Sequence, residues 1–330
     1  MNEATRRDAW ILVTGGSSGL GLECALRLAR AGRAVVVASR DAHARERALR
    51  RIDDETRGAG RALSMDLDLA ETSSVRSLVD RLDDERLDLD AIVCNAGLLA
   101  PRFDRTAAGI ERTFAVNHLG HFLLVNLLLG RGRGISPSHV VVVSSAVHDP
   151  RRFTLMPHPR AGDVRALARD GATTRGRFDG RRTYATSKLC NLWFAYELAR
   201  RAVASGLDRG ARGLRVSAFD PGLVPGSGLA RHQSPLAHAA WTRVLPLATL
   251  PLAPFFPTIG SLGRSGRALA RLVVLEPDRR GTRARYVASH TRWRESVSSR
   301  DSYDEGRARD LWDASVELSG LRPGESPLVP

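Results

Sequence analysis

The chain has 330 residues, of which 43% are hydrophobic, and this is enough for one large α/β domain or two smaller ones. Its formal net charge is +14, but the basic residues are spread along the whole chain among 36 acidic ones and aromatic residues are few, so the composition argues against a nucleic-acid partner. The three cysteines lie far apart in apolar runs, which argues against disulfide pairing and a cysteine zinc site and indicates a cytoplasmic protein with buried, reduced thiols.

A glycine-rich turn follows the first apolar segment of the chain. Residues 1–8 are polar, lack the apolar segment of a signal peptide and are expected to be flexible, while residues 10–13 read as a strand and a helix follows up to about residue 31. A strand, a glycine turn and a helix in this order are typical of a phosphate site for a dinucleotide, because the backbone can approach a pyrophosphate at the helix N-terminus. The expected cofactor contacts in this turn are Gly15, Ser17, Ser18, Gly19, Leu20 and Gly21.

The second strand indicates which dinucleotide binds. Residues 33–38 form a buried-looking strand that ends at Ser39-Arg40. An acidic residue at this strand end would bind the ribose 2′-hydroxyl of NAD, whereas an arginine accommodates the 2′-phosphate of NADP. The missing acid together with Arg40 therefore predicts NADP(H) as the cofactor.

Strands and helices continue to alternate along the chain. The expected elements are helix 42–57, strand 61–65, helix 73–84, strand 91–94, helix 109–129, strand 140–143, strand 213–219, helix 265–275, strand 285–288 and helix 304–319. Such alternation predicts an α/β fold with a single Rossmann-type doubly wound parallel sheet and helices on both faces. Ligands then bind at the carboxyl ends of the strands. The candidate cofactor contacts that follow these strands are Asp66, Leu67, Asn95, Ala96 and Gly97.

Two polar positions lie in or beside the apolar elements. Asn117 stands in the middle of the apolar helix 109–129 and needs hydrogen-bond partners if it is buried. The neighbouring His118 and His121 read as packing or capping residues rather than ligands. Ser145 follows strand 140–143, where its hydroxyl can point into the ligand crevice.

The segment Tyr184-Ala185-Thr186-Ser187-Lys188 places a phenol and an amine one helical turn apart on the same face. A nearby ammonium stabilises the phenolate and should lower the pKa of Tyr184, so that the phenol can exchange a proton with a carbonyl or an alcohol. Among fifty Lys plus Arg residues, Lys188 is the only lysine, and a planar guanidinium does not replace a compact ammonium. These residues predict a catalytic pair; the alternative is an ordinary helix lysine beside a core tyrosine.

The C-terminal half contains an uncharged stretch, residues 244–263, that is long enough to span a membrane but carries four prolines. We expect an apolar substrate lid over residues 227–263, with peripheral membrane contact through 244–263 or a membrane span as alternatives. Residues 148–182, rich in Arg, Gly and Pro, read as a long loop that is either a lid or disordered. Residues 9–320 then form one domain, and 321–330 a frayed tail.

Seven motifs occur in the order found in the short-chain dehydrogenase/reductase family, which the chain resembles over about residues 9–320. They are TGGSSGLG (14–21), Asp66-Leu67, NAG (95–97), Asn117, Ser144-Ser145, YATSK (184–188) and Pro221-Gly222. VNHLGHFLL (116–124) and SKLCNL (187–192) resemble the branch of retinol dehydrogenases and light-dependent protochlorophyllide reductases.

The resemblance implies roles for individual residues. Tyr184 would be the acid/base, and Ser145 would orient the substrate carbonyl. Lys188 would lower the tyrosine pKa and hold the nicotinamide ribose, and Asn117 would hold a water in the proton relay. Pro221, Gly222 and Val224 would line the cofactor site. Gly226 stands where the family often has a threonine that bonds the nicotinamide carboxamide, and Ser227 is the expected substitute.

These features predict an NADPH-dependent reductase of a ketone or aldehyde on an apolar small molecule, or an enzyme that catalyses the reverse oxidation of the alcohol. One alternative is reduction of a carbon–carbon double bond, because Tyr184 and Lys188 would serve both reactions. Another is a non-catalytic NADP(H)-binding regulatory protein, which would have no need of the proton relay. The expected location is the cytoplasm, with membrane association as the alternative, and the sequence does not predict an oligomeric state.

Overall fold

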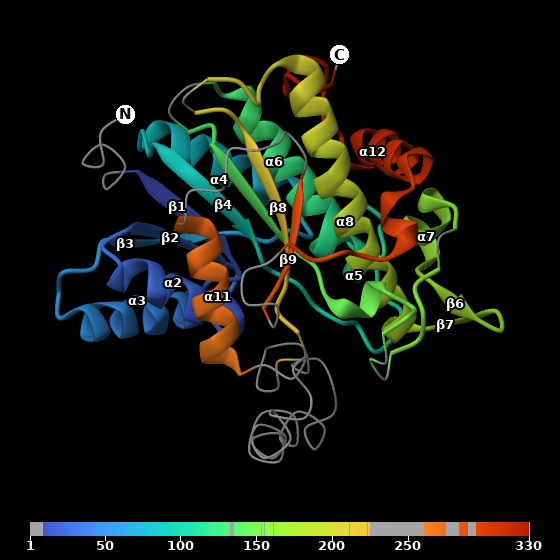
Figure 1. Cartoon of the computed structure of the whole chain (residues 1–330), viewed down its shortest axis with the longest axis horizontal. Helices are drawn as coiled ribbons and strands as arrows, with labels where there is room; N and C mark the ends of the chain where they lie inside the picture. The colour runs from blue at the N-terminus through green and yellow to red at the C-terminus, as the bar shows by residue number, and fades with distance from the viewer. Residues whose placement is uncertain are drawn as a thin grey trace.

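The computed structural model describes residues 9–132, 135–152, 154, 156–160, 162–210, 212–222, 224, 261–274, 284–289 and 295–329. A central twisted sheet has helices packed on both of its faces (Figure 1). The expected flexible segment 1–8 and most of the expected lid, residues 227–260, lie outside the described residues, as do Gly226 and Ser227.

In the part of the chain that the structure describes, the main sheet has seven strands in the order β3-β2-β1-β4-β5-β8-β9, and every neighbouring pair is parallel. The strands are β1 (Trp10–Thr14), β2 (Ala34–Ser39), β3 (Ala62–Asp66), β4 (Leu89–Cys94), β5 (His139–Val143), β8 (Arg215–Asp220) and β9 (Arg285–Ala288). The chain starts in the middle at β1, runs to the edge at β3 and then crosses back to β4. The point where the order reverses lies between β1 and β4, and in such sheets this point opens the ligand crevice. The predicted doubly wound α/β fold is confirmed.

Two layers of helices cover the sheet. The helices are α2 (Gly19–Arg30), α3 (Ala42–Thr56), α4 (Thr72–Asp84), α5 (Arg112–Phe114), α6 (Gly120–Gly130), α7 (Val164–Asp170), α8 (Gly180–Ser205), α11 (Leu262–Val274) and α12 (Glu305–Ser319). Side chains of a parallel strand alternate between the two faces, so Ile11 and Val13 pack with α2, α3 and α11, while Leu12 packs with α4, α6, α8 and α12. Because both faces are covered, the central strands are apolar on both sides.

The expected helix 109–129 is not regular throughout. It begins as α5, widens into the π-helical turn η1 (Ala115–Leu119) and continues as α6. Within the described residues, Arg112–Gly130 has the length and apolar composition of a membrane span, but 94% of its most apolar window is buried inside the protein. It is therefore a core helix, and its central turn is the one that carries Asn117.

The segment expected as a long loop, 148–182, contains ordered elements where it is described. It includes the 3₁₀ turn η2 (Ala146–His148) at its start, α7, and the short antiparallel pair β6 (Thr173–Thr174) and β7 (Arg177–Phe178). Arg165 of α7 pairs with Glu317 of α12 at 2.6 Å. Asp179 then caps α8 by accepting a hydrogen bond from the Arg182 amide. The segment thus leads directly into the helix that carries Tyr184.

The expectation of a frayed tail at 321–330 is wrong for residues 321–329. Leu321 and Leu328 are buried against the core of the α4 and α6 side. Glu325 pairs with Arg76 of α4 at 2.6 Å, and the Ser326 hydroxyl donates to Asn126 Oδ1 at 2.7 Å. The sequence concealed these contacts because the tail carries three prolines and a glycine, and because its partners Asn126 and Arg76 lie 200 and 249 residues away.

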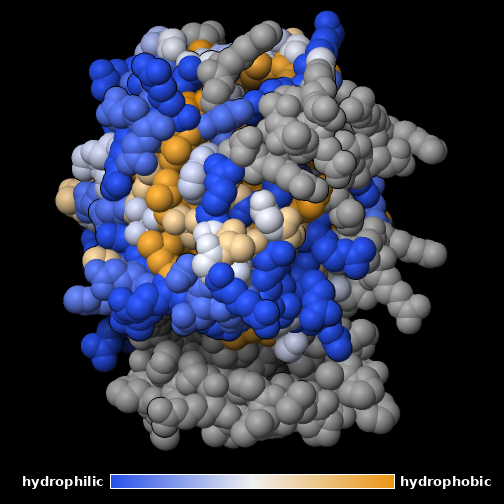
Figure 2. All heavy atoms as spheres, turned by 90° about the vertical axis from the view of Figure 1, so that its left-hand side faces the viewer, coloured by the Kyte–Doolittle hydropathy of each residue, from blue (hydrophilic) through white to orange (hydrophobic). Residues whose placement is uncertain are grey.

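The surface on the side of α3 and β3 is mostly hydrophilic, with a smaller apolar area in its middle (Figure 2). Leu63 of the edge strand β3 is 36% exposed there. Arg51 of α3 pairs with both Glu23 and Glu55, and Arg30 of α2 also pairs with Glu55. Charges of the two signs are therefore interleaved on this face despite the net charge of the chain.

Candidate active site

The glycine turn between β1 and α2 leaves no room for side chains. Gly15 and Gly19 have φ angles of +64° and +56°, in the left-handed region that favours glycine. A Cβ on Gly21 would lie 2.4 Å from the Gly15 carbonyl oxygen and 2.5 Å from Asn95 Nδ2. Ser17, Ser18, Gly19 and Leu20 remain partly exposed at the N-terminus of α2. This bare backbone cradle, with the free N–H groups of a helix start, fits a pyrophosphate.

The end of β2 presents two arginines. The Arg40 side chain is 46% exposed, and its nearest acid is Asp68 at 3.7 Å. Arg45, from the first turn of α3, donates to the Ser39 carbonyl oxygen and to Asp66 Oδ1, the latter at 2.7 Å. Within the described residues, the buried Ser39 hydroxyl has no hydrogen-bond partner. Two guanidinium groups beside a hydroxyl without a partner, all at one strand end, fit a phosphate.

Sequence reasoning identified Arg40 but missed Arg45. The signal was present, because α3 starts at Ala42 and a residue in its first turn can reach back to the end of β2. Asp66 and Leu67 are two of the expected cofactor contacts. The Asp66 side chain is 65% exposed and is held by Arg45, whereas Leu67 is buried in the core.

The segment after β4 is fixed to the end of β1 through Thr14. The backbone N–H groups of Asn95 and Ala96 both donate to the Thr14 hydroxyl, at 2.9 and 3.0 Å. Asn95 Nδ2 also donates to the Thr14 carbonyl at 2.8 Å. A Cβ on Gly97 would lie 3.2 Å from Asn117 Oδ1 and 3.6 Å from Lys188 Nζ. Gly97 therefore lies where the crevice between β1 and β4 meets two of the predicted catalytic residues.

Asn117 is fully buried, and its side chain connects the turn η1 to the segment after β4 and to α8. Its Oδ1 accepts from the Leu98 amide at 2.8 Å. Its Nδ2 donates to the Leu98 carbonyl and to the Ser187 hydroxyl, both at 3.0 Å. The amide thus joins the segment after β4 to α8, the helix that carries Tyr184. The wider turn of a π-helix is a frequent feature of functional sites, and here it presents this residue.

Tyr184 and Lys188 share one face of α8, as predicted. Lys188 Nζ lies 5.5 Å from the centroid of the Tyr184 ring and donates to the Val143 carbonyl at 3.1 Å. The Ser144 hydroxyl donates to the Lys188 carbonyl at 2.8 Å. These bonds fasten α8 to the end of β5, where Ser145 begins η2. The structure therefore brings the serine end of β5, the tyrosine helix and the Asn117 turn into one region.

The pKa of Tyr184 moves in the direction opposite to the one we expected. Burial raises the pKa of this phenol, and the negative charge of Asp220 raises it further. Burial also lowers the pKa of Lys188 to about 8. The ammonium is directed to the Val143 carbonyl, and in this structure the cost of burying the phenolate outweighs the stabilisation that Lys188 can give it.

Asp220 is a buried carboxylate that sequence reasoning did not assign. It ends β8, with Oδ1 accepting from the Gly222 amide at 2.9 Å and Oδ2 from the Tyr286 hydroxyl at 3.1 Å. The Pro221 carbonyl accepts from two serine hydroxyls, those of Ser265 and Ser289, at 2.9 and 2.8 Å. The Pro221-Gly222 turn is thereby held at the same edge of the sheet, and the nearby Val224 is buried.

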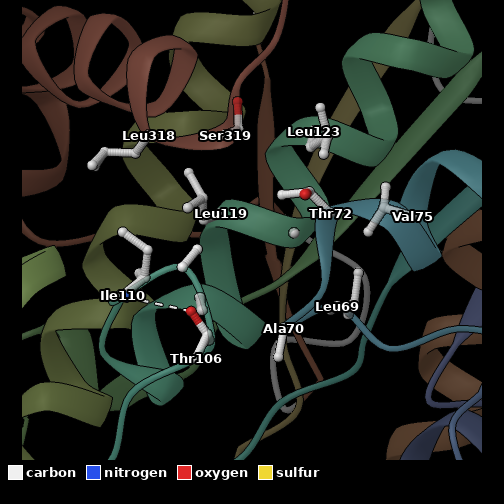
Figure 3. A pocket seen from close by; sticks show the side chains of 13 residues that line it. Leu69, Ala70, Thr72, Val75, Thr106, Ile110, Leu119, Leu123, Leu318 and Ser319 are labelled. Carbon is white, nitrogen blue, oxygen red and sulfur yellow. Dashed lines mark hydrogen bonds between the residues drawn. The ribbon is translucent and has the colours of Figure 1, made fainter.

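A separate apolar pocket lies between α4, the loop before α5, and the end of α12 (Figure 3). Leu69, Thr72, Leu119, Leu123 and Leu318 point into it. None of the predicted catalytic or cofactor residues lines it, and its volume of about 20 Å³ is room for a single water. It is too small to be a substrate site.

Known proteins resemble the chain over most of its length. A family model described as short chain dehydrogenase matches residues 9–155. The chain is 32% identical to retinol dehydrogenase 14 of Homo sapiens, covering 94% of this chain and 86% of that protein. It is 33% identical to protochlorophyllide reductase A, chloroplastic, of Oryza sativa subsp. japonica, covering 96% and 82%. The crystal structure of an uncharacterized protein from Mycobacterium paratuberculosis is similar with a TM-score of 0.65 and 29% identity, covering 94% of this chain and 93% of that one.

Proposed function

The chain belongs to the short-chain dehydrogenase/reductase family, in the branch of retinol dehydrogenases and protochlorophyllide reductases, and from this premise we propose that it is an NADPH-dependent carbonyl reductase. Its substrate would be a ketone or aldehyde on an apolar small molecule. The observation that carries the proposal is the pair Tyr184 and Lys188 on α8, fastened to the serine end of β5. The apolar substrate class rests on the uncharged stretch 244–263, of which 244–260 lies outside the described residues.

The residues divide the proton chemistry among them. Tyr184 donates its phenolic proton to the substrate oxygen, and Ser145 holds that oxygen by a hydrogen bond. A phenol whose pKa is raised by burial stays protonated at neutral pH, as a proton donor to the substrate oxygen must. Lys188 stabilises the phenolate that forms when the proton leaves. The dinucleotide, when bound, supplies the hydride.

The cofactor residues lie in two places, the glycine turn with the segment after β4, and the end of β2. The glycine turn, Asn95, Ala96 and Gly97 would hold the pyrophosphate and the nicotinamide side. Arg40, Arg45 and the Ser39 hydroxyl would hold the 2′-phosphate, because charge-assisted hydrogen bonds from guanidinium groups match phosphate oxygens. Position 40 carries an arginine and not the acidic residue that would bind the ribose 2′-hydroxyl of NAD.

Substrate-dependent oxidation of NADPH tests the proposal. The purified protein is assayed by the loss of NADPH absorbance with a panel of apolar ketones, aldehydes and enones, and the products are identified. Alcohol products support the proposal. Saturation of a carbon–carbon double bond would instead favour the second candidate, which the likeness to protochlorophyllide reductase A supports. Tight NADPH binding without turnover of any substrate would indicate a regulatory protein.

A further inference from the structure

The hydroxyl of Thr14 uses both of its lone pairs as hydrogen-bond acceptors, which leaves only its hydrogen to be assigned. A threonine hydroxyl offers two lone pairs and one hydrogen. Both lone pairs accept backbone N–H groups, those of Asn95 and Ala96. The hydrogen must therefore be donated. Two acceptors lie near it: His121 Nε2 at 2.8 Å and the Val93 carbonyl at 3.2 Å.

The imidazole of His121 is the nearer acceptor and comes from a distant part of the chain. His121 lies in the first turn of α6, one turn after Asn117, and is 2% exposed. Its Nε2 has to be the unprotonated nitrogen, because a hydrogen there would be a third donor on an oxygen with no free lone pair. The hydrogen is then on Nδ1, which lies 3.3 Å from the Asn117 carbonyl. One neutral ring joins the end of β1 to the turn that carries Asn117.

The surroundings keep this ring neutral. The pKa of His121 is lowered to about 4, chiefly by burial and also by the positive charge of Lys188, although the hydrogen bond to the Asn117 carbonyl acts to raise it. The other titratable group beside it is His118, whose pKa burial lowers to about 3. The acceptor at Nε2 is therefore present throughout the neutral range.

The Thr14 hydroxyl ties together two segments that meet at the crevice between β1 and β4. It holds Asn95 and Ala96 of the segment after β4 against the end of β1. Asn95 Nδ2 in turn lies where a Cβ of Gly21 would be, so the glycine turn and this segment are in direct contact. When the hydroxyl donates its hydrogen to His121 Nε2, both of its lone pairs are free to accept the N–H groups of Asn95 and Ala96.

We propose that His121 is a positioning residue for the dinucleotide: its Nε2 orients the Thr14 hydroxyl, and its Nδ1–H links the crevice to the carbonyl of Asn117. The proposal rests on the proposed function, since it concerns the site in which NADP(H) would bind. It assigns to the ring a role beyond packing, because packing alone would be served by an apolar side chain of similar volume.

A pair of substitutions separates the two roles. His121→Gln keeps an acceptor near the position of Nε2, whereas His121→Leu fills the space without one. We expect the dissociation constant for NADP⁺, measured by calorimetry, to rise about three- to tenfold in His121→Leu, the scale of one buried hydrogen bond, and to stay within about twofold in His121→Gln. A packing role predicts the reverse order, with Leu better than Gln in both NADP⁺ binding and melting temperature.

Thr14→Val completes a double-mutant cycle. If His121 acts through the hydroxyl, His121→Leu should add less than about twofold to the NADP⁺ dissociation constant once Thr14→Val has removed that hydroxyl. Full additivity of the two substitutions, or wild-type affinity in His121→Leu, would overturn the proposal while leaving the proposed function intact. A wild-type protein that binds neither NADP⁺ nor NADPH would instead refute the proposed function and this proposal together.

Discussion

Burial shifts the pKa values of Tyr184 and Lys188 in opposite directions, and both shifts favour the neutral form of the side chain. The pKa of the phenol rises, and that of the ammonium falls to about 8. The phenol is then an acid that holds its proton until a substrate oxygen takes it. The ammonium remains charged below pH 8, where it can stabilise the phenolate left behind.

Lys188→Arg tests whether positive charge alone is sufficient. A guanidinium is larger, planar and charged at all working pH values, and it does not fit the site between Val143 and Gly97 without displacing a neighbour. We expect the NADPH-dependent reduction rate to fall at least about tenfold. The wild-type rate should decline as the pH rises through about 8, because Lys188 loses its charge there, and the Arg variant should lack this decline. Full activity with an unchanged pH profile would show that Lys188 has no special role.

The two arginines at the end of β2 make separable predictions for cofactor choice. Arg40→Ala and Arg45→Ala should each weaken NADPH binding by about 1–3 kcal/mol, the range for hydrogen bonds to charged groups, and leave NADH affinity nearly unchanged. Arg47→Ala is the matched control, since Arg47 is an exposed arginine of the same helix. Equal weakening of both cofactors would show that neither arginine contacts the 2′-phosphate. Dissociation constants from fluorescence titration decide the matter.

At the scale of elements, the catalytic region is assembled from ends of strands and starts of helices that side chains tie together. Asn117 links the segment after β4 to α8, and Ser144 links β5 to α8. His148 of η2 adds a third tie. Its Nδ1 donates to the Ser145 carbonyl at 2.5 Å, and its Nε2 accepts from the Ser299 amide at 3.1 Å, one residue before η5 (Arg300–Tyr303). The turn that presents Ser145 is thus fixed to the C-terminal part of the chain.

His148→Leu should loosen the Ser145 turn without affecting the cofactor cradle. We expect kcat/KM for the carbonyl substrate to fall about tenfold, because a buried hydrogen bond on each side of the ring is lost, while the NADP⁺ dissociation constant stays unchanged. His158→Leu serves as the control, because His158 is an exposed histidine of the same segment 148–182. A parallel loss of NADP⁺ affinity would mean that the substitution disturbs the whole domain rather than this turn.

The sequence predicted those parts of the site whose residues follow one another in a short motif. The glycine turn, the residues after β4, and Tyr184 with Lys188 depend on local geometry, so spacing was enough to place them. The contacts that were missed are between distant residues: Thr14 and His121 are 107 positions apart, and Arg45 meets Asp66 across 21. Their residue types are common, and only the folded sheet brings them together.

The π-helical turn could not be predicted either. The apolar pattern of residues 109–129 is that of a continuous helix, and the wider turn at Ala115–Leu119 appears only where Asn117 and His118 are drawn toward partners on α8 and α12. The pKa direction of Tyr184 was mispredicted for a similar reason. The motif shows the nearby lysine, but not the burial of the phenol or the charge of Asp220, which ends a different strand.

At the scale of the whole molecule, four histidines are buried among the residues that the structure describes. They are His118 and His121 of the core helix, His139 of β5 and His148 of η2. Burial lowers the pKa values of the first three to about 3, 4 and 3, and it also lowers the pKa of His148. In the unfolded chain such groups take up a proton near pH 6.5. Between that value and their folded pKa values, the unfolded state binds more protons than the native state, so the free energy of unfolding falls as the pH is lowered.

We therefore expect a steep loss of stability in mild acid. From pH 7 down to pH 5, each buried histidine should remove about 1.4 kcal/mol per pH unit below 6.5 from the free energy of unfolding. Urea denaturation at a series of pH values measures this slope. His139→Asn should reduce this slope by the contribution of one proton, about 1.4 kcal/mol per pH unit. His43→Asn, at an exposed position of α3, should leave the slope unchanged. A midpoint that does not change between pH 7 and pH 5 would contradict the burial of these rings.

The replacement Tyr184→Phe tests the central claim most directly, because it removes one hydroxyl and keeps the buried ring beside Lys188. Two quantities are measured on the same preparation: the rate of NADPH-dependent reduction of the best carbonyl substrate, and the dissociation constant for NADP⁺. We predict that the rate falls about 10²–10⁴-fold, the scale of a positioned proton donor, while cofactor affinity stays within about twofold of the wild type. Wild-type turnover in Tyr184→Phe would contradict the assignment of Tyr184 as the proton donor and, with it, the proposed mechanism.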